Sequence, residues 1–308
     1  MATGDQAGLT TRLRSTRDRL AARLHPWHWL APVSAFYVPF LLAPIATIFV
    51  LSLFSWTSPT DFRFVGFAHY RSLLGGDILY IALRNTVVYT LGNTVLTVGG
   101  GLALALIIQG AYGRVRSLLQ TAYLLPYAIM PVGVGLIWAL MYHPQIGAVN
   151  EVLGILGSDA NPLWLGDSTL VLPAVILAGS WQSVGFYTVI WLVGLASIDR
   201  RYHEAARIDG AGPISRFRYI TLPLLKPIGL FLIVISLITS LRIFGLVWTM
   251  TRGGPGRASE VMVTWMYRTA FIQNNLGRAA AIGVILFVIT MAVSVVLLRA
   301  FGVTEDSQ

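Results

Sequence analysis

The chain has 308 residues, of which 56% are hydrophobic and only 11% are charged, so its composition excludes an ordinary soluble domain. Lys and Arg outnumber Asp and Glu by 22 to 13, which gives a net charge of +9. The absence of cysteine excludes a disulfide framework, a cysteine-based metal site and a thiol nucleophile.

The chain opens with a basic tail, residues 1–28, that carries five arginines. Its leucines recur at roughly helical spacing, which is typical of a basic amphipathic helix on a membrane surface. A disordered basic tail fits the same composition. Either form precedes the first apolar segment.

Six apolar segments follow, each long enough to cross a bilayer of about 30 Å, which takes about 20 helical residues. They predict an all-α polytopic membrane protein whose six transmembrane helices occupy residues 29–301. We expect membrane helices to tolerate Pro126 and Pro131 in the third segment, and Gly179 and Gly185 in the fourth to allow close packing. The six segments are Trp29–Phe54, Thr86–Ile108, Leu118–Met141, Leu170–Ile198, Pro227–Met250 and Ala279–Phe301.

The distribution of Lys and Arg predicts the orientation of these helices. With the N-terminus in the cytoplasm, the inner segments carry roughly twice as many Lys and Arg as the outer loops. This bias puts both termini inside, including the short tail at 302–308, together with the connection between the fourth and fifth helices.

That connection, residues 199–227, is a polar island between two apolar segments. Asp199 can accept hydrogen bonds from the first turn of a helix that starts directly after it. Gly210 suits the left-handed position that ends this helix, and Pro213 suits the first turn of a second one, which we expect to end at Pro223. The stretch therefore predicts a cytoplasmic helix-turn-helix.

This connection resembles the EAA loop of binding-protein-dependent ABC importer permeases. The family pattern is matched by Glu204, Ala205, Ala206, Asp209, Gly210, Ala211, Phe217, Ile220, Leu222 and Pro223. The resemblance implies that the first six of these residues contact the ATPase subunits. The alternative is a solvated amphipathic connector in which Glu204 pairs with Arg200 or Arg207.

Two further segments extend the resemblance to the maltose-permease-like members of the family. Residues 64–70 resemble the segment after the first span of sugar-type permeases, with His69 where Asn is usual. Residues 251–255 resemble a Thr-Gly-Gly-Gly-Pro loop after the fifth span, with Arg252 in place of a Gly. The similarity runs from about Trp29 to Phe301.

The resemblance implies a function and a set of partners. The chain would be one of two permease subunits, as a heterodimer, in the bacterial cytoplasmic (inner) membrane. An extracytoplasmic binding protein would deliver a sugar, an oligosaccharide or a glycoside; glycerol phosphate or a related phosphate ester is the alternative substrate. Two ATPase subunits would bind ATP and Mg. No cofactor is expected on this chain, because its single lysine, Lys226, follows Leu225 where a phosphate-binding loop needs glycine.

Polar and aromatic side chains in the fourth and fifth segments are candidates for the substrate pathway. Arg242 lies near the middle of the fifth segment, where a charge costs about 2.5–3.5 kcal/mol, so we expect it to face water or a partner. Sugars need amide and hydroxyl partners together with flat aromatic surfaces. These groups could instead hold helices together. The candidates are Trp181, Gln182, Ser183, Phe186, Ser236, Ser240 and Arg242.

Functions of other classes find less support. A stand-alone secondary transporter or channel would need ion-coupling acids within the spans, and none of the 13 acidic residues lies in an apolar core. An intramembrane enzyme would need a paired catalytic set. The five histidines show no metal-ligand spacing, and the basic residues flank membrane segments, which explains a basic chain without nucleic acid.

Overall fold

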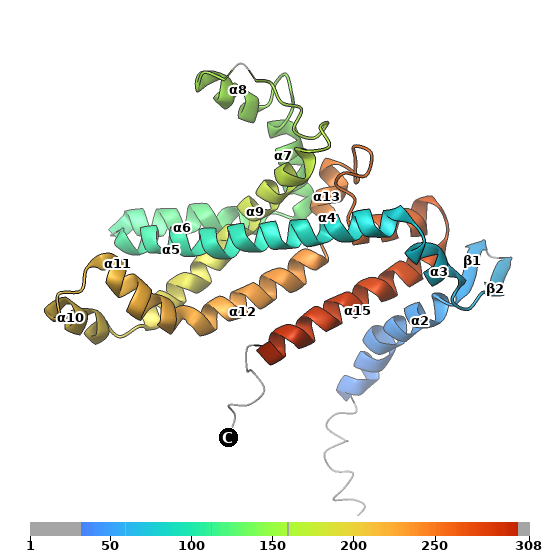
Figure 1. Cartoon of the computed structure of the whole chain (residues 1–308), viewed down its shortest axis with the longest axis horizontal. Coiled ribbons are helices and arrows are strands. Elements are labelled where there is room, and N and C mark those ends of the chain that lie inside the picture. Colours follow the sequence, from blue (N-terminus) through green and yellow to red (C-terminus); the bar gives the residue numbers. More distant parts are fainter. Residues whose placement is uncertain (1–31, 59, 112, 159, 301–308) are drawn as a thin grey trace, which may run out of the picture.

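The protein is a bundle of long helices with one small hairpin, and the computed structural model describes residues 32–58, 60–111, 113–158 and 160–300 (Figure 1). The all-α fold predicted from the sequence is confirmed. The two predicted tails, 1–28 and 302–308, lie outside the described residues. The elements are the π-helical turns η1 (Val38–Leu42), η2 (Val95–Gly99), η3 (Phe217–Thr221) and η4 (Arg268–Ile272), the strands β1 (Phe54–Ser58) and β2 (Asp61–Phe64), and the helices α2 (Ala43–Leu51), α3 (Ala68–Leu74), α4 (Asp77–Thr94), α5 (Gly100–Gly110), α6 (Gly113–Ala128), α7 (Pro131–Met141), α8 (Ala148–Ile155), α9 (Val171–Ser197), α10 (Arg200–Ile208), α11 (Pro213–Arg216), α12 (Leu222–Leu241), α13 (Gly245–Met250), α14 (Met262–Tyr267) and α15 (Leu276–Ala300).

Five continuous helical stretches among the described residues are long and apolar enough to cross a membrane. Four of them overlap the predicted first, second, fourth and sixth segments, although the second helix already begins at Asp77 rather than at Thr86. The remaining stretch, Pro213–Leu241, overlaps the predicted fifth segment, Pro227–Met250, only in part. The stretches are Pro32–Leu51, Asp77–Gly110, Val171–Ser197, Pro213–Leu241 and Leu276–Leu297.

The third predicted segment, Leu118–Met141, is not one continuous helix. It consists of α6 and α7, whose axes meet at 103° across a short break. The cause is Pro131, which has no N–H to donate and which drives the residue before it out of the helical conformation. Met130 is accordingly extended, with φ −58° and ψ 144°. Non-helical backbone therefore lies inside this apolar segment.

The fifth predicted segment, Pro227–Met250, is displaced along the chain. Helix α12 ends at Leu241, and the chain is irregular at residues 242–244 before the short helix α13. At its other end the same helix runs back without interruption to Pro213. The expectation that Pro223 ends the second loop helix is therefore wrong.

The π-helical turn η3 explains why the chain passes Pro223 without stopping. In this turn the Leu222 N–H donates to the Phe217 carbonyl five residues earlier, so the turn is wider than an α-helical one. Pro223 directly follows this turn, inside the continuous helix, so its missing N–H does not end the helix here.

Helix α9 is the centre of the bundle, and the first helix lies at its edge. In α9, 61% of the apolar window is buried, whereas none of the corresponding window in Pro32–Leu51 is buried. Helix α9 packs against α4, α5 and α6, while α2 packs against α15 (Figure 1). Gly185 lets α9 and α6 touch, because a Cβ at this position would overlap the Tyr123 carbonyl. The predicted close packing is thus confirmed at Gly185.

Candidate functional site

The loop that connects α9 to α12 begins with the predicted helix cap. The Arg201 backbone N–H donates to the Asp199 Oδ1 atom at 2.9 Å, so α10 starts directly after Asp199. This backbone hydrogen bond, supported by the Arg201 side chain, holds the pKa of the Asp199 carboxyl below its ordinary value. The predicted cap is confirmed.

The turn that follows explains the spacing of the loop's small residues. Gly210 is left-handed, with φ +78°, and its N–H donates to the Arg207 carbonyl at 3.1 Å. The Ala211 N–H donates to the Ala206 carbonyl at 2.8 Å. These two bonds form a Schellman motif, which needs a glycine where the chain reverses. Pro213 then opens α11, so the predicted helix-turn-helix is confirmed.

The surface of this loop is open. Glu204, Ala205 and Asp209 are exposed, and Ala206 and Ala211 are half-buried. Two isoleucines beside them, Ile208 and Ile214, are 88% and 83% exposed, so apolar surface is available next to Glu204 and Asp209.

The alternative reading of this loop as a self-contained connector gains no support from its ion pairs. The salt bridge found here joins Arg201 to Asp199 at 2.8 Å. Within the described ranges, Glu204 forms no salt bridge with Arg200 or with Arg207.

A cavity of about 460 Å³ lies where the break between α6 and α7 meets α4, α9 and α12. Its side chains are hydroxyl, amide, phenol and apolar groups, and none is an acid, a lysine, an arginine or a histidine. Such a lining suits a neutral polar molecule. The lining residues are Tyr89, Asn93, Tyr127, Ala128, Ile129, Met130, Pro131, Gly179, Gln182, Ser183, Thr239, Ser240 and Ile243.

Three of the predicted pathway residues meet at this cavity: Gln182, Ser183 and Ser240. The Gln182 Nε2 atom donates to the Ile129 carbonyl at 2.8 Å, which satisfies a backbone oxygen freed by the helix break. Irregular backbone inside an apolar segment is tolerated only where protein or water satisfies it. The amide of Gln182 therefore stabilises the break and borders the cavity.

Two aromatic candidates lie differently from the polar ones. Phe186 stacks on Tyr127, with ring centroids 4.9 Å apart, and Tyr127 itself lines the cavity. Trp181 packs edge-on against Trp138 with centroids 5.7 Å apart, and it lines a separate hollow. Tyr127 and Tyr89 are therefore the aromatic side chains that a molecule in the cavity would meet, and Phe186 stacks on Tyr127.

Arg242 is not near the middle of a helical span, because α12 ends one residue before it. Its side chain is exposed, and its Nε atom lies 3.4 Å from the Ile238 carbonyl of its own helix. It lines a separate groove of about 390 Å³ between α2, α12 and α15. The structure therefore does not bring Arg242 together with Gln182, Ser183 and Ser240.

Sequence reasoning missed Asn93, which joins three helices beside the cavity. Its Nδ2 atom donates to the Ser240 Oγ atom at 2.9 Å, and the Ser180 Oγ atom donates to its Oδ1 atom at 3.1 Å. Next to it, the hydroxyls of Ser236 and Thr94 are 2.9 Å apart, so Ser236 holds α4 to α12 rather than lining the cavity. An amide in the middle of an apolar segment is the signal that marks Asn93.

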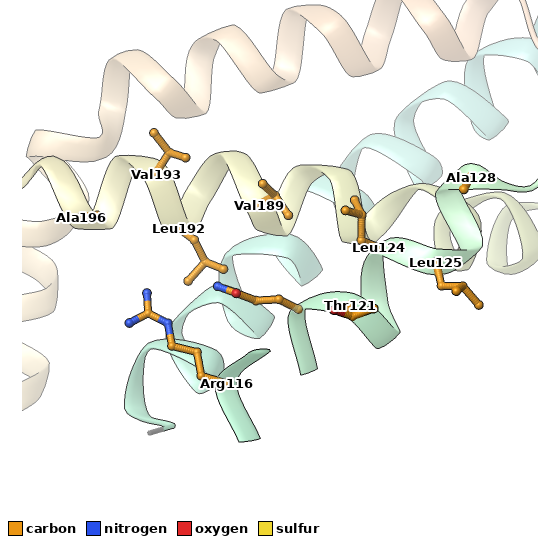
Figure 2. A pocket seen from close by; sticks show the side chains of 10 residues that line it. Arg116, Thr121, Leu124, Leu125, Ala128, Val189, Leu192, Val193 and Ala196 are labelled. Carbon is orange, nitrogen blue, oxygen red and sulfur yellow. The ribbon is translucent and has the colours of Figure 1, made fainter. Parts of the chain in front are cut away.

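A larger hollow of about 550 Å³ lies between α6 and α9 (Figure 2). Its lining is mostly aliphatic, with Arg116 and Gln120 as its longest polar side chains, and it contains none of the predicted pathway residues. Such a surface suits lipid chains. Among the residues that the structure describes, no three His, Asp or Glu side chains are grouped so that they could hold a metal ion.

Comparisons with known proteins agree with this arrangement. Residues 101–302 match the family described as binding-protein-dependent transport system inner membrane component. The chain is 34% identical to the probable ABC transporter permease protein YurN of Bacillus subtilis, over 92% of this chain and 98% of that protein. It is 33% identical to the sulfoquinovosyl glycerol transport system permease protein SmoG of Agrobacterium fabrum, over 94% and 92% of the two chains.

A solved structure shares the fold of this chain. A bacterial ABC transporter involved in the import of the acidic polysaccharide alginate superposes with a TM-score of 0.80, at 23% identity, over 95% of this chain and all of that one. The helical architecture, the loop between α9 and α12 and the family match point to the same class of membrane protein. The chain therefore belongs to the binding-protein-dependent ABC importer permeases.

Proposed function

We propose that this permease carries a neutral sugar, an oligosaccharide or a glycoside, through the cavity at the α6–α7 break. The observation that carries the proposal is the lining of this cavity, which offers hydrogen-bonding groups without an ionised side chain. Gln182, Asn93 and Ser183 supply amide and hydroxyl groups, and Tyr127 supplies a flat face. Sugar hydroxyls and the apolar faces of sugar rings require this combination.

The names of similar permeases also support a sugar as the substrate. Similar permeases are named for the transport of sulfoquinovosyl glycerol, arabinooligosaccharides, and trehalose or maltose. Another is named for sn-glycerol-3-phosphate, which keeps a phosphate ester as the alternative substrate. The exposed guanidinium of Arg242 favours this alternative, but it lies outside the cavity, so the neutral sugar is the better fit.

The assembly that drives transport follows from the exposed loop between α9 and α12. In this proposal two ATPase subunits bind ATP and Mg and grip the surface around Glu204, Ala205 and Ala206. A second permease subunit completes a heterodimer, and an extracytoplasmic binding protein delivers the sugar to the opposite end of the bundle. The complex lies in the bacterial cytoplasmic membrane, with both termini of this chain in the cytoplasm, and ATP hydrolysis alternates the access of the cavity.

Cysteine labelling tests the cavity directly, because the chain has no cysteine of its own. In the complex purified with its native partners, Ser183→Cys should react with a small water-soluble thiol reagent, and a transported oligosaccharide should slow that reaction. Val193→Cys is the matched control: it lies on the same helix, but it lines the apolar hollow of Figure 2 and should stay unlabelled.

The possible substrates give different results in this assay. Protection by sn-glycerol-3-phosphate in place of the oligosaccharide would replace the neutral sugar with the phosphate ester. If Ser183→Cys stays unlabelled while the complex takes up sugar, the cavity is not the pathway.

A further inference from the structure

The connection between α13 and α14 encloses a buried carboxylate. We call residues 251–261 the outer loop, since the proposed orientation puts them outside. Glu260 is 1% exposed, its Oε1 atom accepts from the Thr264 hydroxyl at 2.8 Å, and its Oε2 atom lies 3.3 Å from the Arg268 Nε atom. The loop also folds over this carboxylate: a Cβ at Gly253 would lie 2.8 Å from Oε1. The transport proposal gives none of these groups a role.

Arg268 ties the two ends of the outer loop together. While it pairs with Glu260 at one end, its guanidinium donates to the Arg252 carbonyl at the other. It also lies over the ring of Trp248, 5.7 Å from the ring centroid. One side chain thus bonds to both ends of the loop and packs on the helix that precedes it.

This closure holds the loop in a conformation that its sequence disfavours. Arg252 and Arg257 are left-handed, with φ +49° and +74°, a region that residues with long side chains rarely occupy. Such backbone persists only where surrounding contacts hold it. Release of the ion pair should therefore let the outer loop relax.

The outer loop is bonded to α4, and α4 leads to the cavity. The Asn85 Nδ2 atom donates to the carbonyls of Arg257 and Glu260 at 3.1 and 3.0 Å, so both amide hydrogens are used on the loop. Asn85, Tyr89 and Asn93 follow at four-residue spacing and share one face of α4. The last two line the cavity. One rigid helix face thus connects the outer loop with the cavity.

We propose that Glu260 and Arg268 form a latch that positions the outer loop, so that docking of the binding protein is passed through α4 to the cavity. Glu260 is a positioning residue: it touches neither the sugar nor ATP. The inference rests on the proposed function, because it needs a binding protein that docks on the outer side. It adds the structural element that detects this docking.

Glu260→Gln tests the latch with minimal change of shape. The amide still accepts from Thr264, but it no longer carries the charge that pairs with Arg268. In the complex with its ATPase and binding protein, basal ATP hydrolysis should stay unchanged. Stimulation by the sugar-loaded binding protein should fall about tenfold, the size of an ordinary allosteric coupling. Glu151→Gln, the same substitution at an exposed glutamate of α8, is the matched control and should change neither rate.

A second readout follows the loop itself. The half-buried Ala258 can be replaced by cysteine, and the labelling rate of Ala258→Cys should rise several-fold in the Glu260→Gln background. If Glu260→Gln does not assemble, Arg268→Lys serves instead: it keeps the charge but loses the fork that reaches Arg252, so it should reduce stimulation by a smaller factor.

The outcomes separate the latch from transport itself. Wild-type stimulation in Glu260→Gln, or an unchanged labelling rate at Ala258→Cys, would overturn the latch and leave the proposed function standing. A wild-type complex that no sugar-loaded binding protein stimulates would overturn both.

Discussion

Substitutions at Gly210 should show whether the geometry of the turn between α10 and α11 matters for the proposed coupling to the ATPase subunits. The glycine is left-handed, and a Cβ placed there would meet nothing within 4 Å. The cost of a side chain is therefore conformational rather than steric. For Gly210→Ala it should be about 1–2 kcal/mol, the usual cost of a left-handed L-residue, and Asn should cost less because it visits this region more readily.

Gly210→Pro should be far more damaging. Proline fixes φ near −65°, whereas the native φ is +78°, so the chain cannot reverse at this position. It also removes the N–H that donates to Arg207, a bond worth about 1 kcal/mol. We expect transport per ATP hydrolysed to decrease in the order wild type, Asn, Ala, Pro. Membrane insertion should survive throughout, because the turn lies outside the apolar segments.

The assay is sugar uptake and ATP hydrolysis by the reconstituted complex, with ATPase association measured by co-purification. Gly212→Ala is the control, since Gly212 has an ordinary φ of −69° and open space around it, and it should behave as wild type. The reasoning is refuted if Gly210→Pro transports at the wild-type ratio with normal ATPase association, or if Asn proves as damaging as Pro.

Two further substitutions test individual side chains. Glu204→Ala should leave expression unchanged, because Glu204 is exposed and forms no salt bridge among the described residues. The same substitution should weaken ATPase recruitment in a pull-down. If recruitment and ATPase activity are both unaffected, Glu204 is only a solvated residue. Arg242→Gln should preserve the uptake of a neutral sugar, because Arg242 lies outside the cavity, whereas a phosphate ester would need a cation, which Lys replaces in part and Gln does not. Selective loss of phosphate-ester uptake in Arg242→Gln would count against the neutral sugar.

Local sequence chemistry predicted the loop between α9 and α12 better than it predicted the helices beside it. Asp199, Gly210 and Pro213 each meet a local requirement: a helix cap, a left-handed residue and a first helical turn. Their roles can therefore be predicted from the few residues around them. Pro223 failed as a helix end because the chain reaches it through a π-helical turn, which nearest-neighbour rules do not predict. Hydrophobicity located the membrane segments but not where a helix breaks inside one.

The same limit applies to the cavity. Gln182 and Ser240 were identifiable because polar side chains are rare in apolar segments. Pro131 was noticed, but a proline in a membrane helix is often accommodated, so the sequence alone does not show that this one marks a break. Arg242 was predicted near the middle of a membrane helix because the fifth segment was expected to end at Met250, whereas α12 ends at Leu241. Asn93 carried a signal equal to that of Gln182, and it went unused.

The contact between the first and last helices sets the order in which this protein can be completed. The ring of Phe49 on α2 meets the ring of Phe287 on α15 edge-on, with centroids 5.5 Å apart. During synthesis the first helix enters the bilayer long before its packing partner exists. Almost the entire chain must be made before these two helices can close on each other, because α15 is the last helix of the described residues. A ribosome that stalls before α15 would leave an inserted but unfinished protein, with its oldest helix still unpaired.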